Sequence, residues 1–353
     1  MNAHAAVRRN HSHGKRELAR TSSIRLAAPE DGVLDEMLGR AGDVIATGIA
    51  TEILRIVFRH RRLRQTTGGC AANPCPTCLA PHLESVKRFV LAGEPVHFVL
   101  PAFPVKSPSR RKTIGPLPDL AEELALSFLQ SVCDEVAHVH RPGAKITICS
   151  DGRVFSDIVG VTEEAVTRYG AEIASIVATL GGCSLDFFNL EDLFEAEDFE
   201  AMRVHLVEHY AEPIEVIRER TRTEDPHRAL FCGILRFLVE DRTGQAPGKT
   251  RSRLQKDSKS DAYRMIQRSN AWSRLIADHF PDAVRLSIHP QEAHSEKIGI
   301  RLCQTSDAWL TPWHSAVLKS QERFRLVHRE EAEALGARLV YRSGHPSHYE
   351  LAA

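Results

Sequence analysis

A loop rich in cations and hydroxyl groups follows the first strongly apolar segment of the chain. It covers residues 101–115, and its charged and hydroxyl side chains include Lys106, Ser107, Arg110, Arg111 and Lys112. Fixed cations, hydroxyls and backbone N–H groups are the donors that bind phosphates. A lysine that is desolvated or flanked by cations can also act as a base, because both effects lower its pKa. The loop therefore predicts an anion site, or else an exposed turn whose charges face water.

A second polar turn, Ser150-Asp151-Gly152-Arg153, follows another apolar segment. Glycine permits backbone shapes that other residues resist. Arg153 in such a turn can bind a carboxylate or phosphate through two parallel hydrogen bonds. Asp151 can instead be its structural salt-bridge partner, and on these four residues alone that pairing is the safer interpretation.

Further candidates lie in the second half of the chain. His289 begins a third polar loop, and Arg268 shares a helix face with Arg264. Arg268 therefore belongs either to a basic wall over an anionic substrate or to a solvated helix face. His314 ends a Trp- and Pro-rich segment at 309–314, and aromatic residues at this density more often fill a core than line a pocket.

Three cysteines and a histidine fall within thirteen residues with the spacing C-x4-C-x2-C-x3-H. They are Cys70, Cys75, Cys78 and His82. Thiolates and imidazoles are the ligands of tetrahedral zinc, but no second cysteine pair completes the usual paired spacing. Free thiols are the preferred interpretation, with structural zinc as the minority hypothesis. No motif of a catalytic metal, a dinucleotide fold, a P-loop or an α/β-hydrolase is present.

The elements that must position these residues alternate between strand and helix. Apolar runs at 96–100, 145–150 and 183–188 predict buried strands. Asp119 with Glu122 forms a capping box for a helix that ends near 139, and Thr162 caps a second helix that ends near 180. This alternation predicts an α/β fold with a parallel, Rossmann-like sheet flanked by helices. The ligand crevice of such a sheet lies at the carboxyl ends of its strands, where the polar loops begin.

The rest of the chain predicts additional helices and strands in the C-terminal half. We expect helices within 31–64 and at 198–220, 227–241 and 260–280, strands at 284–288, 298–302 and 338–341, and a polar linker at 243–259. Residues 1–28 are basic and lack apolar periodicity, which predicts a disordered tail. Residues 29–353 are then one domain, with a subdivision near 190–260 left open.

Composition excludes several classes of protein. The 353 residues carry 46 Lys and Arg against 46 Asp and Glu, which argues against a nucleic-acid or membrane-surface binder. No apolar stretch is long enough to cross a bilayer, and no secretion signal is visible. Eight cysteines are too few for a disulfide scaffold. We therefore expect a cytoplasmic protein of enzyme size.

Several long motifs in the right order resemble the isonitrile synthases of the pyoverdine/dityrosine biosynthesis family. These motifs occupy residues 100–108, 112–119, 148–157, 267–272, 285–290 and 311–314. The resemblance runs from about residue 40 to the C-terminus and is greatest to the bacterial enzymes of the paerucumarin type, which act on L-tyrosine. Cys75 to Cys78 and the ending at 344–349 are part of it.

The resemblance implies that the amine of an aromatic amino acid reacts with the ketone of ribulose 5-phosphate, which supplies the isonitrile carbon. L-Tyrosine is the expected substrate, and L-tryptophan is the alternative substrate. An alternative reaction is the formation of N-formyl-tyrosine, as in the dityrosine branch. The alternative outside the enzymes is a regulator that binds a phosphosugar without turnover. No cofactor is expected. The expected partners are these small molecules, with an Fe(II)/2-oxoglutarate oxygenase as a separate pathway neighbour and a homodimer as the commonest oligomer.

Roles follow from this chemistry as hypotheses. Proton transfers are assigned to Lys106, Lys112 and Asp151. The substrate-binding residues are Ser107, Ser150, Arg153, Arg268, Arg285, His289 and His314. Among these, Arg153 or Arg268 is expected to hold the sugar phosphate and Arg285 the amino-acid carboxylate, by bidentate pairing.

Overall fold

A computed structural model describes residues 31–64, 69–194, 198–243, 245, 248–305 and 310–351. The predicted tail at 1–28 lies outside these residues. The chain divides into two compact units, residues 1–42 and 43–353. The described part of the first unit is the beginning of helix α1 (Asp31–Phe58). All that follows concerns the second unit.

The centre of the second unit is a five-stranded parallel sheet, as the sequence predicted. Its strands, in the spatial order β3-β2-β1-β4-β5, are β1 (Val96–Pro101), β2 (Ala144–Cys149), β3 (Leu185–Phe188), β4 (Val284–Ser287) and β5 (Ile298–Gly299). The chain moves outward in one direction from β1 to β3 and then in the other from β4 to β5. The order therefore reverses between β1 and β4, which is where doubly wound sheets bind ligands.

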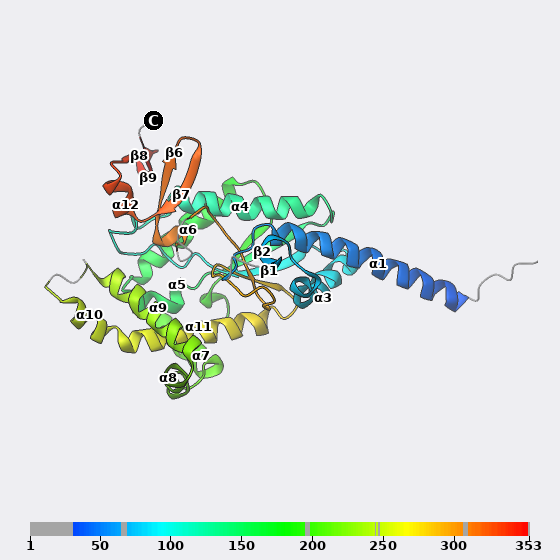
Figure 1. Cartoon of the computed structure of the whole chain (residues 1–353), viewed down its shortest axis with the longest axis horizontal. Coiled ribbons are helices and arrows are strands. Elements are labelled where there is room, and N and C mark those ends of the chain that lie inside the picture. The colour runs from blue at the N-terminus through cyan, green and yellow to red at the C-terminus, as the bar shows by residue number, and fades with distance from the viewer. Residues whose placement is uncertain are drawn as a thin grey trace, which may run out of the picture. The chain divides into compact units, whose positions relative to one another are not determined.

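Helices cover both faces of this sheet (Figure 1). One face packs on α3 (Pro76–Ala92), α4 (Leu120–Ala137) and α6 (Glu163–Thr179), and the other on α7 (Phe199–Tyr210) and α11 (Lys259–His279). Side chains of β1 alternate between these layers: Phe98 and Leu100 join the first core and Val99 joins the second. Burial on both faces explains why β1 is continuously apolar in sequence.

The predicted helix starts are confirmed. Asp119 accepts a hydrogen bond from the Ala121 N–H at 2.8 Å, and Glu122 reaches back to the Asp119 N–H at 3.0 Å, so the capping box closes. Thr162 Oγ1 accepts from the Ala165 N–H at 3.2 Å at the start of α6. A short helix that the sequence analysis missed, α5 (Gly152–Val159), follows β2 directly.

The helical part of the second half differs from the sequence prediction in two places. The expected helix at 198–220 is two helices, α7 and α8 (Ile214–Thr223), because Pro213 cannot continue a helix. The expected linker at 243–259 contains α10 (Arg251–Asp257), which Thr250 caps. The intervening helix is α9 (Asp225–Arg242), and a four-residue helix, α2 (Gly69–Ala72), precedes α3.

A mixed four-stranded sheet completes the described chain. Its spatial order is β7-β6-β9-β8, with β6 (Ala316–Ser320), β7 (Arg323–Val327), β8 (Arg338–Arg342) and β9 (His345–Glu350); α12 (Arg329–Ala334) lies between β7 and β8 in the chain. Only β8 was predicted. Short 3-10 helices occur at η1 (Leu190–Asp192) and η2 (Pro312–His314). Among the described helices, none is both long and apolar enough to cross a bilayer.

Candidate functional site

Six of the ten predicted site residues lie in the loops that follow β1, β2 and β4, at the carboxyl edge of the parallel sheet. The loop after β1 carries Lys106, Ser107 and Lys112, the turn after β2 carries Ser150 and Asp151, and the loop after β4 carries His289. The 310–315 segment packs against the first of these loops, since the Ser107 N–H donates to the Trp313 carbonyl at 2.8 Å. These loops form the candidate site.

Close backbone contact fixes the first loop against α5. Ser150 Oγ donates to the Phe103 carbonyl at 3.1 Å, and Phe103 adopts a φ of 56° that few non-glycine residues take. A Cβ added to Gly152 would lie 2.2 Å from the Pro104 carbonyl oxygen. Only glycine fits this position. The glycine of the second polar turn therefore serves a close approach between two site loops.

Lys106 lies in a fully buried charge cluster. Its Nζ is 2.8 Å from Asp119 Oδ2 and 2.6 Å from Glu122 Oε2, and it donates to the Pro312 carbonyl at 3.1 Å. The Tyr169 hydroxyl donates to Glu122 at 3.1 Å. The two residues of the capping box thus also hold the lysine, a double role that the sequence did not reveal.

These carboxylates reverse the expected effect on Lys106. Desolvation lowers its pKa, but attraction to Asp119 and Glu122 outweighs desolvation and raises the pKa above its ordinary value. Arg111 pairs instead with Glu330 at the surface, at 2.6 Å. Lys106 is therefore protonated at neutral pH, contrary to the lowered pKa expected from flanking cations, and it fits a fixed positive charge better than a free base.

A second cluster forms around the buried carboxylate of Asp241, at the end of α9. Ser107 Oγ donates to Asp241 Oδ2 at 3.1 Å, and Lys112 Nζ lies 2.6 Å from Asp241 Oδ1. Lys112 also lies 4.9 Å from the centre of the Phe237 ring, which contacts the His314 ring at 4.9 Å. Helix α9 thereby holds Ser107, Lys112 and His314 in one region of the candidate site.

Two neutral histidines face this region. Desolvation, followed by the charges of Arg62 and Lys297, lowers the pKa of His289 to about 4, although the side chain is solvent-exposed. Desolvation and Lys112 keep the pKa of His314 well below its ordinary value, and the charge of His289 contributes. Both imidazoles can donate or accept hydrogen bonds in this region without carrying charge.

Asp151 is suited to move protons. Its Oδ1 is buried and has no hydrogen-bond partner among the described residues. Desolvation raises its pKa to about 7, and no described cation offsets this effect. A carboxyl group whose pKa lies near the working pH can both accept and release protons efficiently. Arg153 points elsewhere, so the predicted Asp151–Arg153 salt bridge is wrong.

Arg153 and Arg268 are engaged by protein groups. Arg153 donates to Glu191 at 2.7 Å and to Glu163 at 2.9 Å, and its guanidinium lies 3.9 Å from the centre of the Phe199 ring. Arg268 is 2.5 Å from Asp157 and also donates to the Val154 carbonyl. Binding of a phosphate by either arginine would have to displace these partners.

Arg285 and Lys297 are two cations that form no ion pair with a carboxylate among the described residues. Arg285 donates to Ser273 Oγ at 2.7 Å, and Lys297 reaches the same oxygen at 3.0 Å. Desolvation, with Arg285 adding to it, lowers the pKa of Lys297 to about 8. Two partly buried cations on one hydroxyl are arranged to bind an anion. Sequence reasoning missed Lys297, because it lies in an unremarkable stretch of the β4–β5 loop.

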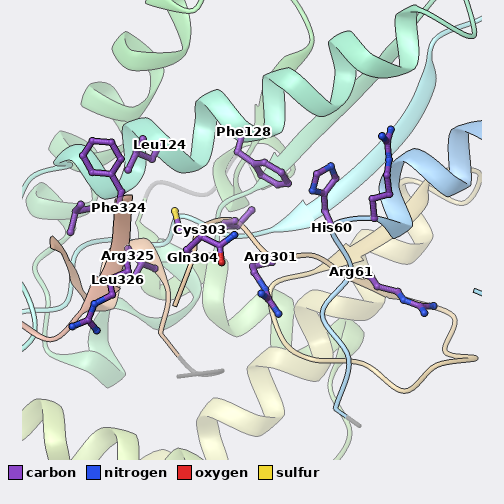
Figure 2. A pocket seen from close by; sticks show the side chains of 13 residues that line it. His60, Arg61, Leu124, Phe128, Arg301, Cys303, Gln304, Phe324, Arg325 and Leu326 are labelled. Carbon is purple, nitrogen blue, oxygen red and sulfur yellow. The ribbon is translucent and has the colours of Figure 1, made fainter. Parts of the chain in front are cut away.

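A separate cavity of about 510 Å³ contains none of the predicted site residues (Figure 2). Leu124 and Phe128 of α4 line it together with Phe324 of β7 and Arg301. The Arg301 side chain makes no ion pair with a described residue. Basic and aromatic groups make this cavity a competing location for an anionic or aromatic ligand.

The three cysteines of the motif lie together with a different histidine from the one predicted. The donor atoms of Cys70, Cys75, Cys78 and His294 all lie within 4.8 Å of one another. His82 is buried with its ring 5.9 Å from that of Phe58, outside this group. The minority ligand set is therefore wrong in its fourth member. His294 is more than 200 residues away in sequence, so no local spacing pattern includes it.

Comparison with known proteins identifies relatives over most of the chain. The family described as pyoverdine/dityrosine biosynthesis protein matches residues 86–340. The L-tryptophan isonitrile synthase AmbI2 of Fischerella ambigua is 50% identical over 301 residues, which cover 85% of this chain and 91% of that protein. The L-tyrosine isonitrile synthase of Pseudomonas aeruginosa is 41% identical over 321 residues, covering 90% of this chain and 97% of its own.

The fold has a counterpart in a solved structure. The crystal structure of the PvcA protein from Pseudomonas aeruginosa superposes with a TM-score of 0.79 at 42% sequence identity. The match covers 86% of this chain and 99% of that one. The predicted α/β class with its flanking helices is confirmed.

Proposed function

The chain belongs to the pyoverdine/dityrosine biosynthesis family and is an isonitrile synthase, and we propose that its substrate is the aromatic amino acid L-tryptophan. The observation that carries this proposal is the higher identity to an L-tryptophan enzyme than to an L-tyrosine enzyme. The proposed substrate therefore differs from the one expected from the sequence motifs, which was L-tyrosine. L-Tyrosine remains the second candidate, because that relative also covers nearly the whole chain.

The proposed carbon donor is ribulose 5-phosphate. The amino-acid nitrogen attacks the sugar ketone and water leaves to give an imine, so protons must be removed from nitrogen and delivered to oxygen. Asp151 is the proposed proton carrier, supported by its buried, unpartnered oxygen and its pKa of about 7. Protonated Lys106 has its three N–H donors on Asp119, Glu122 and the Pro312 carbonyl, so its proposed role is to hold the first site loop in position.

The proposed anion contacts come from Arg285 and Lys297. They would bind the amino-acid carboxylate, with neutral His289 and His314 donating or accepting hydrogen bonds to substrate oxygens. Ser107, Ser150 and Lys112 hold the site loops in position through the contacts described above. Arg153 and Arg268 remain candidates for the sugar phosphate, provided that substrate displaces their carboxylate partners.

Mass spectrometry of the purified protein with ribulose 5-phosphate and each aromatic amino acid tests the function. We expect a product that gains one carbon and loses two hydrogens, formed with a higher kcat/KM from L-tryptophan than from L-tyrosine. A higher kcat/KM for L-tyrosine would overturn the substrate proposal. An N-formyl product, or phosphosugar binding without turnover, would place the chain in one of the alternative classes.

Arg285→Ala and Arg301→Ala together test where the amino acid binds. Loss of a charge-assisted hydrogen bond costs about 1.5–3 kcal/mol, so Arg285→Ala should raise the KM for the amino acid about tenfold to a hundredfold. Arg301→Ala removes a cation of equal charge from the separate cavity and should leave KM unchanged. The reverse pattern would move the substrate site to that cavity.

A further inference from the structure

We propose that Cys70, Cys75, Cys78 and His294 bind one Zn²⁺ ion, which fixes the α2–α3 region to the loop between β4 and β5. The proposal rests on the arrangement of these four side chains and is independent of the substrate assignment. Three thiols and one imidazole are a common donor set of structural zinc sites. Because four protein ligands complete the tetrahedron, the site would be structural and would leave no position for a reacting water.

The distances between the donor atoms match a zinc tetrahedron. Zinc bonds of about 2.3 Å to sulfur and about 2.0–2.1 Å to nitrogen give tetrahedral edges of about 3.8 Å between two sulfurs and about 3.6 Å between sulfur and nitrogen. Cys75 Sγ lies 3.6 Å from Cys70 Sγ and 3.6 Å from Cys78 Sγ. His294 Nε2 lies 3.5 Å from Cys75 Sγ and 3.7 Å from Cys70 Sγ. The remaining two edges are no longer than 4.8 Å.

Disulfide formation and thiol hydrogen bonding account for the cluster less well than a metal does. A disulfide needs sulfurs about 2.05 Å apart, whereas the Cys75 sulfur lies 3.6 Å from each of the other two. A disulfide between two of the three thiols would also leave the third without a partner. All three cysteines are free thiols in the structure. Hydrogen bonds of thiol groups are weak, so by themselves they give little reason for four such groups, from three separate segments, to converge on one point.

The local backbone also favours the ligand form of the cysteines. Cys75 is the N-cap of α3 and Cys78 lies in its first turn, and the N-terminal end of a helix stabilises thiolates. Pro76 at the first helical position fixes the start of the helix. Cys75 makes no side-chain cap hydrogen bond, which leaves its sulfur available to a metal.

The position of His294 indicates what the proposed zinc site would do for the structure. It lies in the loop that carries His289 before it and Lys297 after it, both of which face the candidate site. Loops of this kind are the least constrained parts of a fold. A metal bond to His294 would hold this loop against α3, so that the two candidate ligand-binding residues keep their positions.

Metal analysis of the purified full-length protein tests the proposal. We expect one zinc per chain by mass spectrometry, and zinc release on titration with a mercurial thiol reagent, followed with a chromogenic chelator. Cobalt added to the chelator-stripped protein should produce the intense sulfur-to-metal charge-transfer bands and visible bands of a tetrahedral site. Wild-type protein purified with added zinc that carries no stoichiometric metal, and shows no such cobalt bands, would overturn the proposal.

Variants then identify the ligands. Cys75→Ser and His294→Ala should each lower the zinc content to well below half, whereas Cys183→Ser, which changes an exposed cysteine outside the cluster, should leave it at one per chain. His82→Gln separates the two histidines, because the proposal expects it to keep zinc. If His82→Gln loses the metal and His294→Ala keeps it, the ligand set is wrong. Should a variant fail to fold, the cobalt spectrum of the wild type still decides whether the site exists.

Discussion

Asp151 gives the clearest expectation at the scale of single residues. If it carries the protons, kcat/KM should rise with pH through its pKa of about 7, as the carboxyl group ionises. Asp151→Asn should lower kcat by about a hundredfold or more and abolish that pH dependence. Steady-state kinetics from pH 5 to 9 on both proteins checks this. An Asn variant with full turnover would exclude Asp151 from the chemistry.

The same substitution should affect stability in the opposite direction. The pKa of Asp151 is raised on folding, so the folded state binds this proton more tightly than the unfolded state. Its stabilising contribution is complete below about pH 4 and is lost as pH rises to about 7. At pH 8 the Asn variant should therefore be more stable than the wild type, by about 1–3 kcal/mol. Denaturant unfolding at pH 5 and pH 8 measures the difference.

Loss of Lys106 should lower both activity and stability, and a second substitution can separate the two effects. Lys106→Ala leaves Asp119 and Glu122 buried without their cation and should cost about 3–5 kcal/mol of stability. We also expect kcat to fall about a hundredfold, with a smaller change in KM. Thermal unfolding and kinetics measure the two effects.

The double variant Lys106→Ala/Glu122→Gln is the matched control, because it removes one of the two uncompensated carboxylates. It should regain part of the lost stability and none of the activity. If activity returns together with stability, the role of Lys106 is structural alone.

At the scale of elements, sequence was most informative where local physics decides the structure. The apolar run at β1 predicted a buried strand because burial on both faces demands apolar side chains. Asp119 and Glu122 predicted the start of α4 because a capping box satisfies its own end groups. Pro213 is a local signal that was overlooked within a long amphipathic stretch.

Elements and sites that depend on distant partners were missed. Strands β6, β7 and β9 are short and half-buried, and they are defined by pairing with one another rather than by their own composition. The ion pairs of Lys106 and Lys112 depend on Asp119, Glu122 and Asp241, which the fold brings together. The sequence predicted the loops of the candidate site but could not reveal which charges neutralise one another.

The packing of α5 against the loop after β1 makes Gly152 a specific test. Gly152→Ala places a Cβ 2.2 Å from the Pro104 carbonyl oxygen and 2.8 Å from Val166, so α5 or the loop must move. We expect a loss of about 2–4 kcal/mol of stability and at least a tenfold fall in kcat, since Asp151 precedes this residue. Gly170→Ala is the control: nothing lies within 4 Å of its added Cβ, and alanine should stabilise exposed α6 by about 0.5–1 kcal/mol. Equal behaviour of the two variants would show that the close contact is not constraining.

At the scale of the whole molecule, the sheet and the cysteine cluster have different structural roles. The parallel sheet brings the site loops to one edge, and the proposed zinc joins segments that are 224 residues apart in sequence, Cys70 and His294. A ligand that binds only the folded state stabilises it by about 4 kcal/mol when its free concentration is a thousand times its Kd. Zinc can therefore contribute much of the marginal stability of a protein without taking part in its chemistry.

Removal of the metal should consequently separate stability from catalysis. After treatment with a strong chelator, we expect the Tm to fall by about 5–10 °C and to recover on addition of zinc. Below the new Tm, kcat should stay within about threefold of its original value, because no ligand of the cluster lies in the candidate site. KM should rise, since the loop that carries His289 and Lys297 loses its anchor at His294. Differential scanning fluorimetry and steady-state kinetics on the same samples measure both effects.

Two outcomes would contradict this prediction. Complete loss of kcat in a protein that is still folded would place the metal in the reaction. An unchanged Tm would show that the cluster contributes nothing to the stability of the fold.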